Sequence, residues 1–407
     1  MQNHSFLPTM TDRIPSIKKL ADAIKQGFER PMETKVPKRA LVLSGGGARA
    51  SYQVGVLRAI ANILPKDSSN PFPIISGASA GALNAASLAT HTQRLRTGVR
   101  TLEYAWRNIT SDQVYRLDSS AIISNASQWV FSFLAHRPRE SQTSLLNNAP
   151  LEALLAKLIK FDRIQAAVDS GRLEALAVTS SGYSSGESVS FFQGQESQAN
   201  WQRPHRIGIR TQLNLQHLLA STAIPTLFPA VRINREFFGD GAIRQLAPLS
   251  PAIHLGADKI FAIGVSGNKA KRPPKGTVVN HPSLAQILGH ILNSAFVDTM
   301  DNDLANLRRY NTLLSHLPEN VEAPELETLR KIDLLDISPS QDLNVIASEH
   351  FDDLPKAMKL FVRDSGSSTI LSLLLFEKAY CQRLIELGYQ DAMEKEAQIQ
   401  AFFANPK

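Results

Sequence analysis

Apolar positions along the 407-residue chain follow two periods, and together they predict an α/β protein. Short continuous runs of apolar, often β-branched residues predict buried strands, whereas apolar residues that recur every three or four positions predict helices with one buried face. The predicted strands cover residues 39–44, 73–76, 176–179, 188–192, 259–265 and 332–337.

The last two predicted strands are expected to belong to one sheet. Residues 259–265 and 332–337 enclose an amphipathic helix that begins near residue 284 and runs towards residue 307. A strand, a long helix and a second strand form a βαβ crossover, which joins parallel strands. We therefore expect the sheet to continue beyond residues 269–276, which form the clearest exposed linker.

Residues 1–37 form an N-terminal arm with one predicted amphipathic helix. Its apolar positions include Ile14, Ile17, Leu20 and Ile24, and basic residues lie between them. Such a helix can pack on the rest of the protein or lie on a lipid interface. We favour packing, because most short amphipathic helices pack.

Composition excludes several classes of site. Hydrophobic residues make up 43% of the chain and charged residues 20%, so a substantial core can be buried. The single cysteine, Cys381, excludes an intramolecular disulfide and a cysteine-rich zinc site. The sequence has no His-Glu-x-x-His motif either. We expect neither a metal nor a cofactor.

The net charge of +7 comes from basic residues that are spread along the chain. Nucleic-acid binding proteins usually carry a basic stripe with interleaved aromatic residues, and this chain has none, so we expect no nucleic-acid partner. An anionic membrane surface fits the charge better. No apolar run reaches the roughly 18–20 residues of a spanning helix, and the first residues lack the pattern of a signal peptide. We therefore expect a cytoplasmic protein with peripheral membrane contact as an option; the sequence leaves the oligomeric state open.

Residues 74–88 have the pattern of a nucleophile elbow. A β-branched run leads into Gly77-x-Ser79-x-Gly81, and an Ala/Leu-rich helix follows. A serine on a tight strand-to-helix turn requires small neighbours, because strand and helix approach closely there. The helix that starts near Ala80 would direct its free N–H groups towards developing negative charge. The same pentapeptide also occurs in ordinary strand–helix turns.

Two further features supply the other parts that acyl transfer needs. A glycine run at residues 45–47 presents backbone N–H groups without side chains, and the Ala80 N–H adds another donor. Asp240 precedes Gly241, which permits a sharp turn, and its carboxylate can act as the base for Ser79. Each feature is weak alone, but their combination in this order indicates acyl transfer.

These residues resemble the patatin-like phospholipases over about residues 39–267. Two departures are visible: Ala50 stands where many members have glycine, and Ala242 stands where many have a second glycine after the aspartate. An Asp-Gly-Ala form also occurs in that family. The matching blocks are Gly45-Gly46-Gly47-Ala48-Arg49 with Tyr52-Gln53-Val54-Gly55-Val56-Leu57, Gly77-Ala78-Ser79-Ala80-Gly81-Ala82-Leu83-Asn84-Ala85, and Ala220-Ser221-Thr222-Ala223-Ile224-Pro225 with Phe228-Pro229 and Asp240-Gly241-Ala242.

The resemblance implies a three-layer α/β/α sandwich with a mostly parallel central sheet. It also implies hydrolysis of lipid esters, of the phospholipase A or lysophospholipase type, by a dyad of Ser79 and Asp240 without a catalytic histidine. The implied oxyanion hole comprises Gly45, Gly46, Gly47 and Ala80. The implied supporting residues are Ala48, Arg49, Gly77, Gly81, Gly241 and Ala242.

A dyad of this kind makes an unusual demand on Asp240. A free aspartate has a pKa near 3.9 and is a poor base for a hydroxyl group, so burial must raise its basicity or pre-organisation must compensate. Arg49 is expected to anchor the oxyanion loop rather than to take part in the chemistry.

Several alternatives stay open. Gly45-x-Gly47-x-x-Ala50 also satisfies a dinucleotide fingerprint, but Asp67, its expected acidic partner, lies in a polar loop rather than at a strand end. An acyl-thioesterase would use the same constellation, and a non-catalytic lipid-surface or scaffold protein would keep the fold alone. A histidine-dependent α/β-hydrolase would need a base from a short list: His254, His281 and His290.

The patterns divide the chain into five regions. These are the arm (1–37), the patatin-like catalytic region (38–268), the linker (269–276), the crossover helix and strand that complete the sheet (277–340) and a helical C-terminal region (341–407).

Overall fold

The computed structural model of the chain describes residues 36–116, 144–267, 281, 284–295, 299–316, 330–356, 358–359 and 368–404. By its internal contacts the chain divides into two units, Met1–Pro37 and Lys38–Lys407, and the described residues lie almost entirely in the second. The amphipathic helix expected in the arm and the linker expected at residues 269–276 lie outside the described residues.

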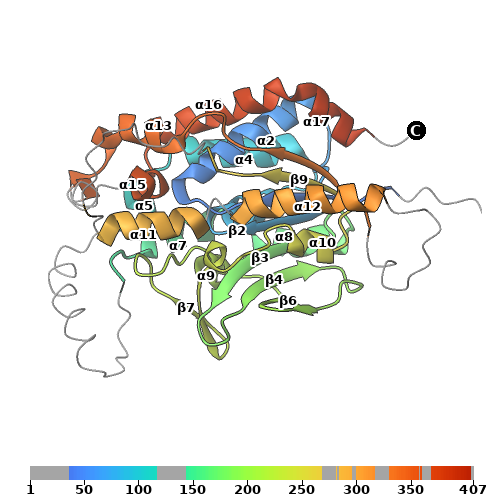
Figure 1. Ribbon diagram of the computed structural model, residues 1–407, viewed down its shortest axis with the longest axis horizontal. Helices are drawn as coiled ribbons and strands as arrows, with labels where there is room; N and C mark the ends of the chain where they lie inside the picture. Colours follow the sequence, from blue (N-terminus) through green and yellow to red (C-terminus); the bar gives the residue numbers. More distant parts are fainter. Residues whose placement is uncertain are drawn as a thin grey trace, which may run out of the picture. The chain divides into compact units, whose positions relative to one another are not determined.

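A ten-stranded sheet runs through the second unit (Figure 1). Its strands are β1 (Arg39–Leu43), β2 (Ile74–Ala78), β3 (Ala175–Gly182), β4 (Ser188–Gly194), β5 (Trp201–Arg203), β6 (Arg206–Arg210), β7 (Val231–Ile233), β8 (Glu236–Asp240), β9 (Lys259–Ile263) and β10 (Asp333–Ile337). The order is β10-β9-β1-β2-β3-β4-β6-β5, and β8 pairs with both β3 and β7. The strands from β10 to β3 are all parallel, whereas β4 and β8 join β3 antiparallel.

Helices and short 3₁₀ turns connect these strands. The helices are α2 (Ser51–Ile63), α3 (Ala80–Ala89), α4 (Leu95–Arg107), α5 (Ser111–Val114), α7 (Ala149–Leu158), α8 (Phe161–Asp169), α9 (Leu215–Ser221), α10 (Ser250–His254), α11 (Leu284–Asn293), α12 (Thr299–Ser315), α13 (Leu343–Glu349), α15 (Ser368–Leu374), α16 (Lys378–Glu394) and α17 (Glu396–Phe403). The 3₁₀ turns are η1 (Gly47–Ala50), η2 (Gly241–Ile243) and η4 (Phe351–Asp353).

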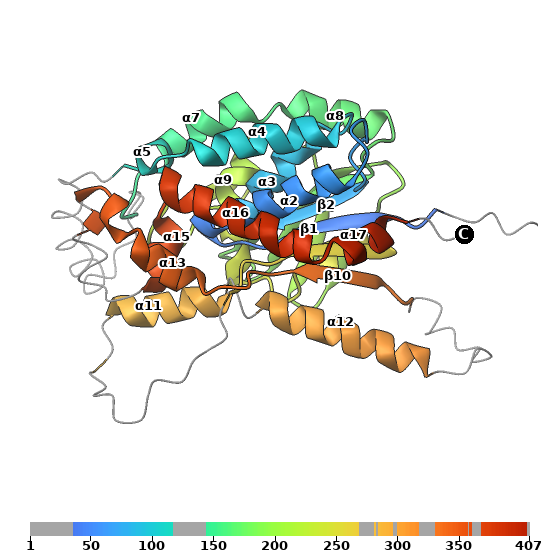
Figure 2. The same cartoon turned by 90° about the horizontal axis from the view of Figure 1, so that it is seen from above.

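The alternation of side chains along β1 shows how the three layers arise. Leu41 and Leu43 point to one face of the sheet, where they join a core with residues of α2, α3, α4 and α16. Ala40 and Val42 point to the other face, where they pack with residues of α10 and α12. Figure 2 shows α12 on one side of the strands and α2, α3 and α4 on the other. The fold is therefore a three-layer α/β/α sandwich with a mostly parallel sheet.

The described residues of the connection between β9 and β10 form two helices, α11 and α12, where a single one was expected. Leu292 of α11 belongs to the first core, whereas Met300 and Leu304 of α12 belong to the second. One straight helix cannot bury its apolar stripe on both sides of the sheet, which accounts for the division. Because β10 pairs in parallel with β9, the sheet continues past residues 269–276.

The topology places the loops after β1 and β2 side by side. These two strands are neighbours and run parallel, so the segments that follow their carboxyl ends meet at one edge of the sheet. The glycine run follows β1, and Ser79 follows β2. In the described parts of the chain, no helix combines the length and the apolar composition that a bilayer crossing requires.

Candidate active site

Ser79 lies in the turn between β2 and α3, where the backbone is strained. Its φ of 53° and ψ of −134° fall in a region that residues with a side chain rarely adopt. Close packing holds this turn, because a Cβ atom on Gly77 would lie 2.5 Å from the carbonyl oxygen of Gly81. The Ser79 N–H donates to Oγ of Ser221 at 2.9 Å, so this N–H is not free to bind a substrate oxygen.

The structure brings Ser79 and Asp240 into direct contact, although 161 residues separate them. Oγ of Ser79 donates a hydrogen bond of 2.5 Å to Oδ2 of Asp240. The second carboxylate oxygen, Oδ1, accepts from the backbone N–H of Ala242 at 2.9 Å. The end of β8 positions Asp240, because its backbone N–H donates to the carbonyl oxygen of Ala223 at 2.8 Å.

Burial makes the Asp240 carboxylate more basic than a free aspartate. The residue is completely buried. Burial raises the pKa of Asp240 from 3.8 to about 7, and the hydrogen bonds from Ser79 and Ala242 act in the opposite direction. An acid whose pKa lies near neutral pH is well matched to proton transfer at that pH.

The glycine run forms a loop that leads from β1 into η1, and α15 supports it. Gly47 has a φ of 54°, and a Cβ atom there would overlap the carbonyl oxygen of Leu373 in α15. Only glycine fits this position, because the backbone of α15 lies directly against the loop. Gly47 lines the same pocket as Ser79 and Ala80, so the loop and the elbow face one space.

Arg49 joins this loop to the C-terminal helices. Its guanidinium is buried, and it donates to Oγ of Ser372 at 2.6 and 2.9 Å and to Oδ1 of Asn344 at 2.8 Å. Burial lowers the pKa of Arg49, and the nearby Tyr380 and Asp342 partly offset that effect. The contacts are those of an anchor, since they fix the loop to α13 and α15.

The remaining small residues of the motifs allow close approach around the dyad. A Cβ atom on Gly81 would lie 2.5 Å from the carbonyl oxygen of Leu43, and one on Gly241 would overlap the carbonyl oxygen of Thr179. Ala48 and Ala242 are buried in the first core.

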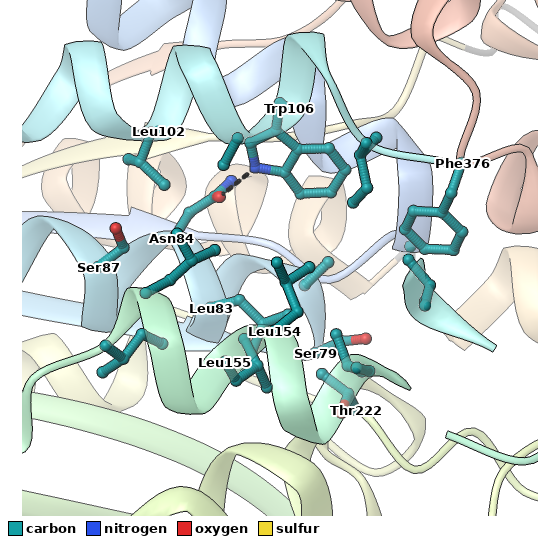
Figure 3. A pocket seen from close by; sticks show the side chains of 18 of the residues that line it. Ser79, Leu83, Asn84, Ser87, Leu102, Trp106, Leu154, Leu155, Thr222 and Phe376 are labelled. Carbon is teal, nitrogen blue, oxygen red and sulfur yellow. Dashed lines mark hydrogen bonds between the residues drawn. The ribbon is translucent and has the colours of Figure 1, made fainter. Parts of the chain in front are cut away.

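Ser79 lines an apolar pocket of about 830 Å³, a volume that includes open solvent. Helices α3, α4 and α7 form most of its wall, and Leu373, Leu374 and Phe376 from the C-terminal region complete it. Figure 3 shows Ser87 on one side of the lining and Ser79 and Phe376 on the other, with Leu83 and Leu155 between them. An apolar lining of this kind is typical of sites that hold hydrocarbon groups.

The patatin-like phospholipase family model matches residues 41–253, which is slightly more than half of the chain. The chain belongs to the patatin-like phospholipase family. The matched region contains the glycine loop, the elbow and Asp240, but it ends before β9, β10 and the C-terminal helices.

Individual proteins match this chain either over a short segment or at low sequence identity. A patatin-like phospholipase domain-containing protein of Coccidioides immitis is 43% identical over 75 residues, which are 18% of this chain and 9% of that protein. Among solved structures, human GIVD cytosolic phospholipase A2 in complex with methyl gamma-linolenyl fluorophosphonate is 15% identical with a TM-score of 0.42, and the match covers 94% of this chain and 62% of that one. VipD from Legionella pneumophila is 13% identical with a TM-score of 0.33, with 89% and 67% covered.

In this patatin-like chain, a buried amide network supports the pocket wall. Asn84 of α3 accepts a 2.8 Å hydrogen bond from Nε1 of Trp106 and donates to Oε1 of Gln53 at 2.9 Å and to the carbonyl oxygen of Ala50 at 3.1 Å. Sequence reasoning assigned no role to Asn84, Trp106 or Ser221. Asn84 and Gln53 stand inside the matched blocks, but polar residues in a helical pattern are normally expected to face solvent.

None of the three histidines considered from the sequence is hydrogen-bonded to Ser79 in the described parts of the chain. His254 bonds the carbonyl oxygen of Ser250 through Nδ1 at 2.8 Å and stacks on Trp201, whereas His281 and His290 are exposed. Asp67, the acidic residue of the dinucleotide alternative, lies 3.9 Å from Arg94 on the surface. Among the described residues, no group of His, Cys, Asp and Glu side chains is arranged to hold a metal ion.

Proposed function

We propose that the chain is a serine lipid acyl hydrolase in which Ser79 is the nucleophile and Asp240 is the base. The observation that carries the proposal is the 2.5 Å hydrogen bond from Oγ of Ser79, which lines the apolar pocket, to the fully buried carboxylate of Asp240. A strained serine, a buried base and a glycine-rich loop are the parts that acyl transfer requires.

In the first half of the proposed reaction, Asp240 takes the proton of Ser79 as Oγ bonds to the ester carbonyl carbon. The backbone N–H groups of the glycine loop and of Ala80 stabilise the negative charge that develops on the carbonyl oxygen. When the tetrahedral intermediate collapses, the bond to the alcohol oxygen breaks, and Asp240 returns the proton to the leaving alcohol.

In the second half, water replaces the alcohol. Asp240 takes a proton from a water molecule as that water attacks the acyl-enzyme, and the proton passes to Oγ as the fatty acid leaves. No histidine takes part. A carboxylate can carry both steps because its raised pKa of about 7 lets it bind and release a proton near neutral pH.

The pocket supports an acyl chain as the part of the substrate that is recognised. We propose an activity of the phospholipase A or lysophospholipase type, because an apolar slot beside the nucleophile selects for long-chain esters over small polar ones. Neutral lipids and acyl-thioesters share that acyl group, so a panel of head groups on one acyl chain is needed to rank them.

The test compares dyad variants with histidine variants on one short-chain ester. Ser79→Ala should abolish turnover and Asp240→Asn should be nearly as damaging, whereas His254→Ala, His281→Ala and His290→Ala should leave turnover nearly unchanged. Labelling of the parent by an alkyl fluorophosphonate, with the adduct located on Ser79 by mass spectrometry, gives a second readout. Loss of activity in a well-folded histidine variant, with Asp240→Asn still active, would restore the histidine-dependent hydrolase. A folded parent that binds lipid vesicles but neither turns over esters nor takes the label would support the non-catalytic alternative.

A further inference from the structure

A second, polar groove lies at the C-terminal end of α3, the helix that Ser79 precedes. The groove measures about 890 Å³ including its open side, and α8, the turn after α3 and the start of α4 form its walls. Its lining includes His91, Thr97 and three arginines, Arg94, Arg163 and Arg172. None of the described residues that line it carries a carboxylate. We call it the arginine groove.

On α3 with its following turn, and on α4, a residue of the arginine groove stands one helical turn from a residue of the pocket. Ser87 lines the pocket, and its carbonyl oxygen lies 3.1 Å from Nδ1 of the groove residue His91. On α4, the pocket residue Thr101 donates from Oγ1 to the carbonyl oxygen of the groove residue Thr97 at 3.0 Å.

On a third wall, a groove residue again stands four positions from a pocket residue. Ile159 lines the pocket, and Arg163 lines the groove four residues later, across the junction of α7 and α8. Figure 2 shows α7 and α8 on the same side of the sheet as α4. On three walls, groove residues therefore follow or precede pocket residues by four positions, so the two spaces are neighbours, although they share no lining residue.

The length of the pocket sets a distance between Ser79 and the arginines. Ser79 precedes α3 and Ser87 lies eight residues further along it, which at 1.5 Å per residue places their Cα atoms about 12 Å apart. The groove begins at Thr90 and His91, eleven and twelve residues beyond Ser79, which places its start about 17–18 Å from the nucleophile. An extended alkyl chain advances roughly 1.3 Å per carbon, given a C–C bond of about 1.5 Å. About thirteen or fourteen carbons span that distance.

The charges around the groove leave it positive. Asp67 is 3.9 Å from Arg94, but both side chains are largely exposed, so this pair is weak. Arg172 donates to Oγ of Ser170 rather than to a carboxylate, and Arg163 forms no ion pair with any described residue. A guanidinium binds a carboxylate through two parallel N–H bonds where the approach is open.

We propose that the pocket and the arginine groove together select an ester whose acyl chain ends in a carboxylate, with about thirteen or fourteen carbons between the two carbonyl carbons. This inference rests on the proposed function, because the ester must react at Ser79. The chain would lie along α3 while its terminal carboxylate meets Arg94, Arg163 and Arg172. Hydrolysis adds one water across the ester bond and releases a dicarboxylic acid and the alcohol.

The experiment uses two fluorogenic esters of equal length, the 4-methylumbelliferyl ester of hexadecanoic acid and the mono-ester of hexadecanedioic acid, with the butyrate ester as a reference. The measured quantity is the ratio of kcat/KM for the carboxylated ester to that for the neutral ester. We expect this ratio to exceed one at low salt and to fall as salt screens the exposed charges. In the triple variant Arg94→Gln/Arg163→Gln/Arg172→Gln it should fall roughly threefold to 150-fold, the range expected for three exposed charge pairs.

Two controls make the result specific. Arg235→Gln removes an exposed arginine that lines neither space and should leave the ratio unchanged. Butyrate hydrolysis should be equal in the parent and the triple variant, since a four-carbon chain does not reach the groove.

Two results would overturn the inference while leaving the proposed function intact. One is a parent that hydrolyses butyrate but shows a ratio of one or less. The other is a triple variant that hydrolyses butyrate and keeps the ratio of the parent; if this variant also binds phosphatidylserine vesicles more weakly than the parent, the arginines belong to a contact with an anionic bilayer. Absence of butyrate hydrolysis in the folded parent would instead refute the proposed function itself.

Discussion

Replacing Asp240 by asparagine should remove activity and, at alkaline pH, make the protein more stable. The pKa of Asp240 is raised from 3.8 to about 7 in the folded state, so the folded protein holds this proton more tightly than the unfolded chain does. Stability that the protonated carboxyl contributes is therefore lost as the pH rises from about 4 to about 7 and stays lost above that window. An asparagine carries no charge to bury, so its contribution should not change over that window.

The size of the effect follows from the displacement of the pKa. About three pKa units at about 1.4 kcal/mol each give an upper value of roughly 4 kcal/mol at pH 8. Asparagine can keep both contacts, because Oδ1 can accept from the Ala242 N–H while the amide nitrogen donates to Oγ of Ser79. We expect Asp240→Asn to be more stable than the parent by about 1–4 kcal/mol at pH 8, and the difference to shrink as the pH falls towards 4.

Urea unfolding of the parent, Asp240→Asn and Ser79→Ala at several pH values between 4 and 8 measures this difference. Ser79→Ala is the matched control, since it should lose activity but still lose stability as the pH rises. Its loss should extend to higher pH than in the parent, because the Ser79 hydrogen bond that lowers the pKa of Asp240 is gone. In the parent, kcat/KM should rise with pH and level off above about 7, because the base acts in its ionised form. Two outcomes would refute the assignment of Asp240, a buried aspartate with a raised pKa, as the base. One is an Asp240→Asn variant that is no more stable than the parent at pH 8. The other is a kcat/KM of the parent that does not change from pH 5 to pH 8.

Three further substitutions test the surroundings of the dyad. Gly47→Ala places a Cβ atom against the carbonyl oxygen of Leu373 at a positive φ, so kcat should fall by more than the roughly 10²–10³-fold typical of one lost oxyanion donor; a near-normal kcat for butyrate would exclude a role for the loop. Leu155→Trp fills the pocket between Ser79 and Ser87 and should lower kcat/KM for dodecanoate at least tenfold while sparing butyrate, and equal losses on both esters would contradict an acyl site there. Ser372→Ala removes the hydroxyl group that accepts two hydrogen bonds from Arg49. The fold should lose about 1–3 kcal/mol of stability, and kcat should fall more than KM changes. Unchanged urea unfolding and unchanged kinetics would show that this anchor is dispensable.

Local patterns account for most of the fold. The apolar runs at residues 39–44 and 259–265 became β1 and β9, because a strand buried on both faces needs apolar side chains at every position. The small residues around Ser79 indicated the elbow, since few other arrangements require glycine on both sides of a serine. The short strands β5 and β7 were not expected, because three-residue strands are too brief to show a period.

The rest depended on long-range contacts that no local pattern reveals. Asp240 and Ser79 were paired through the family resemblance, and their spacing in the sequence carries no sign of contact. Ser372 and Asn344 follow ordinary helical patterns, and their contacts with Arg49 arise only when α13 and α15 pack against the glycine loop. The arginine groove could not be predicted for the same reason. Arg163 belongs to α8, whereas Arg94 precedes α4 and Arg172 follows α8.

The support of the glycine loop by α15 has a consequence for how the protein is made on the ribosome. Arg49 and its partner Ser372 are 323 residues apart, and β1 pairs with a strand that begins at Lys259. A ribosome that adds roughly 5–20 residues per second needs about 15–60 s to synthesise the chain from Arg49 to Ser372. During synthesis β1 can pair with β2 early, but its other edge stays without β9 and the glycine loop stays without α15. Nascent chains should therefore acquire esterase activity only once α15 has emerged.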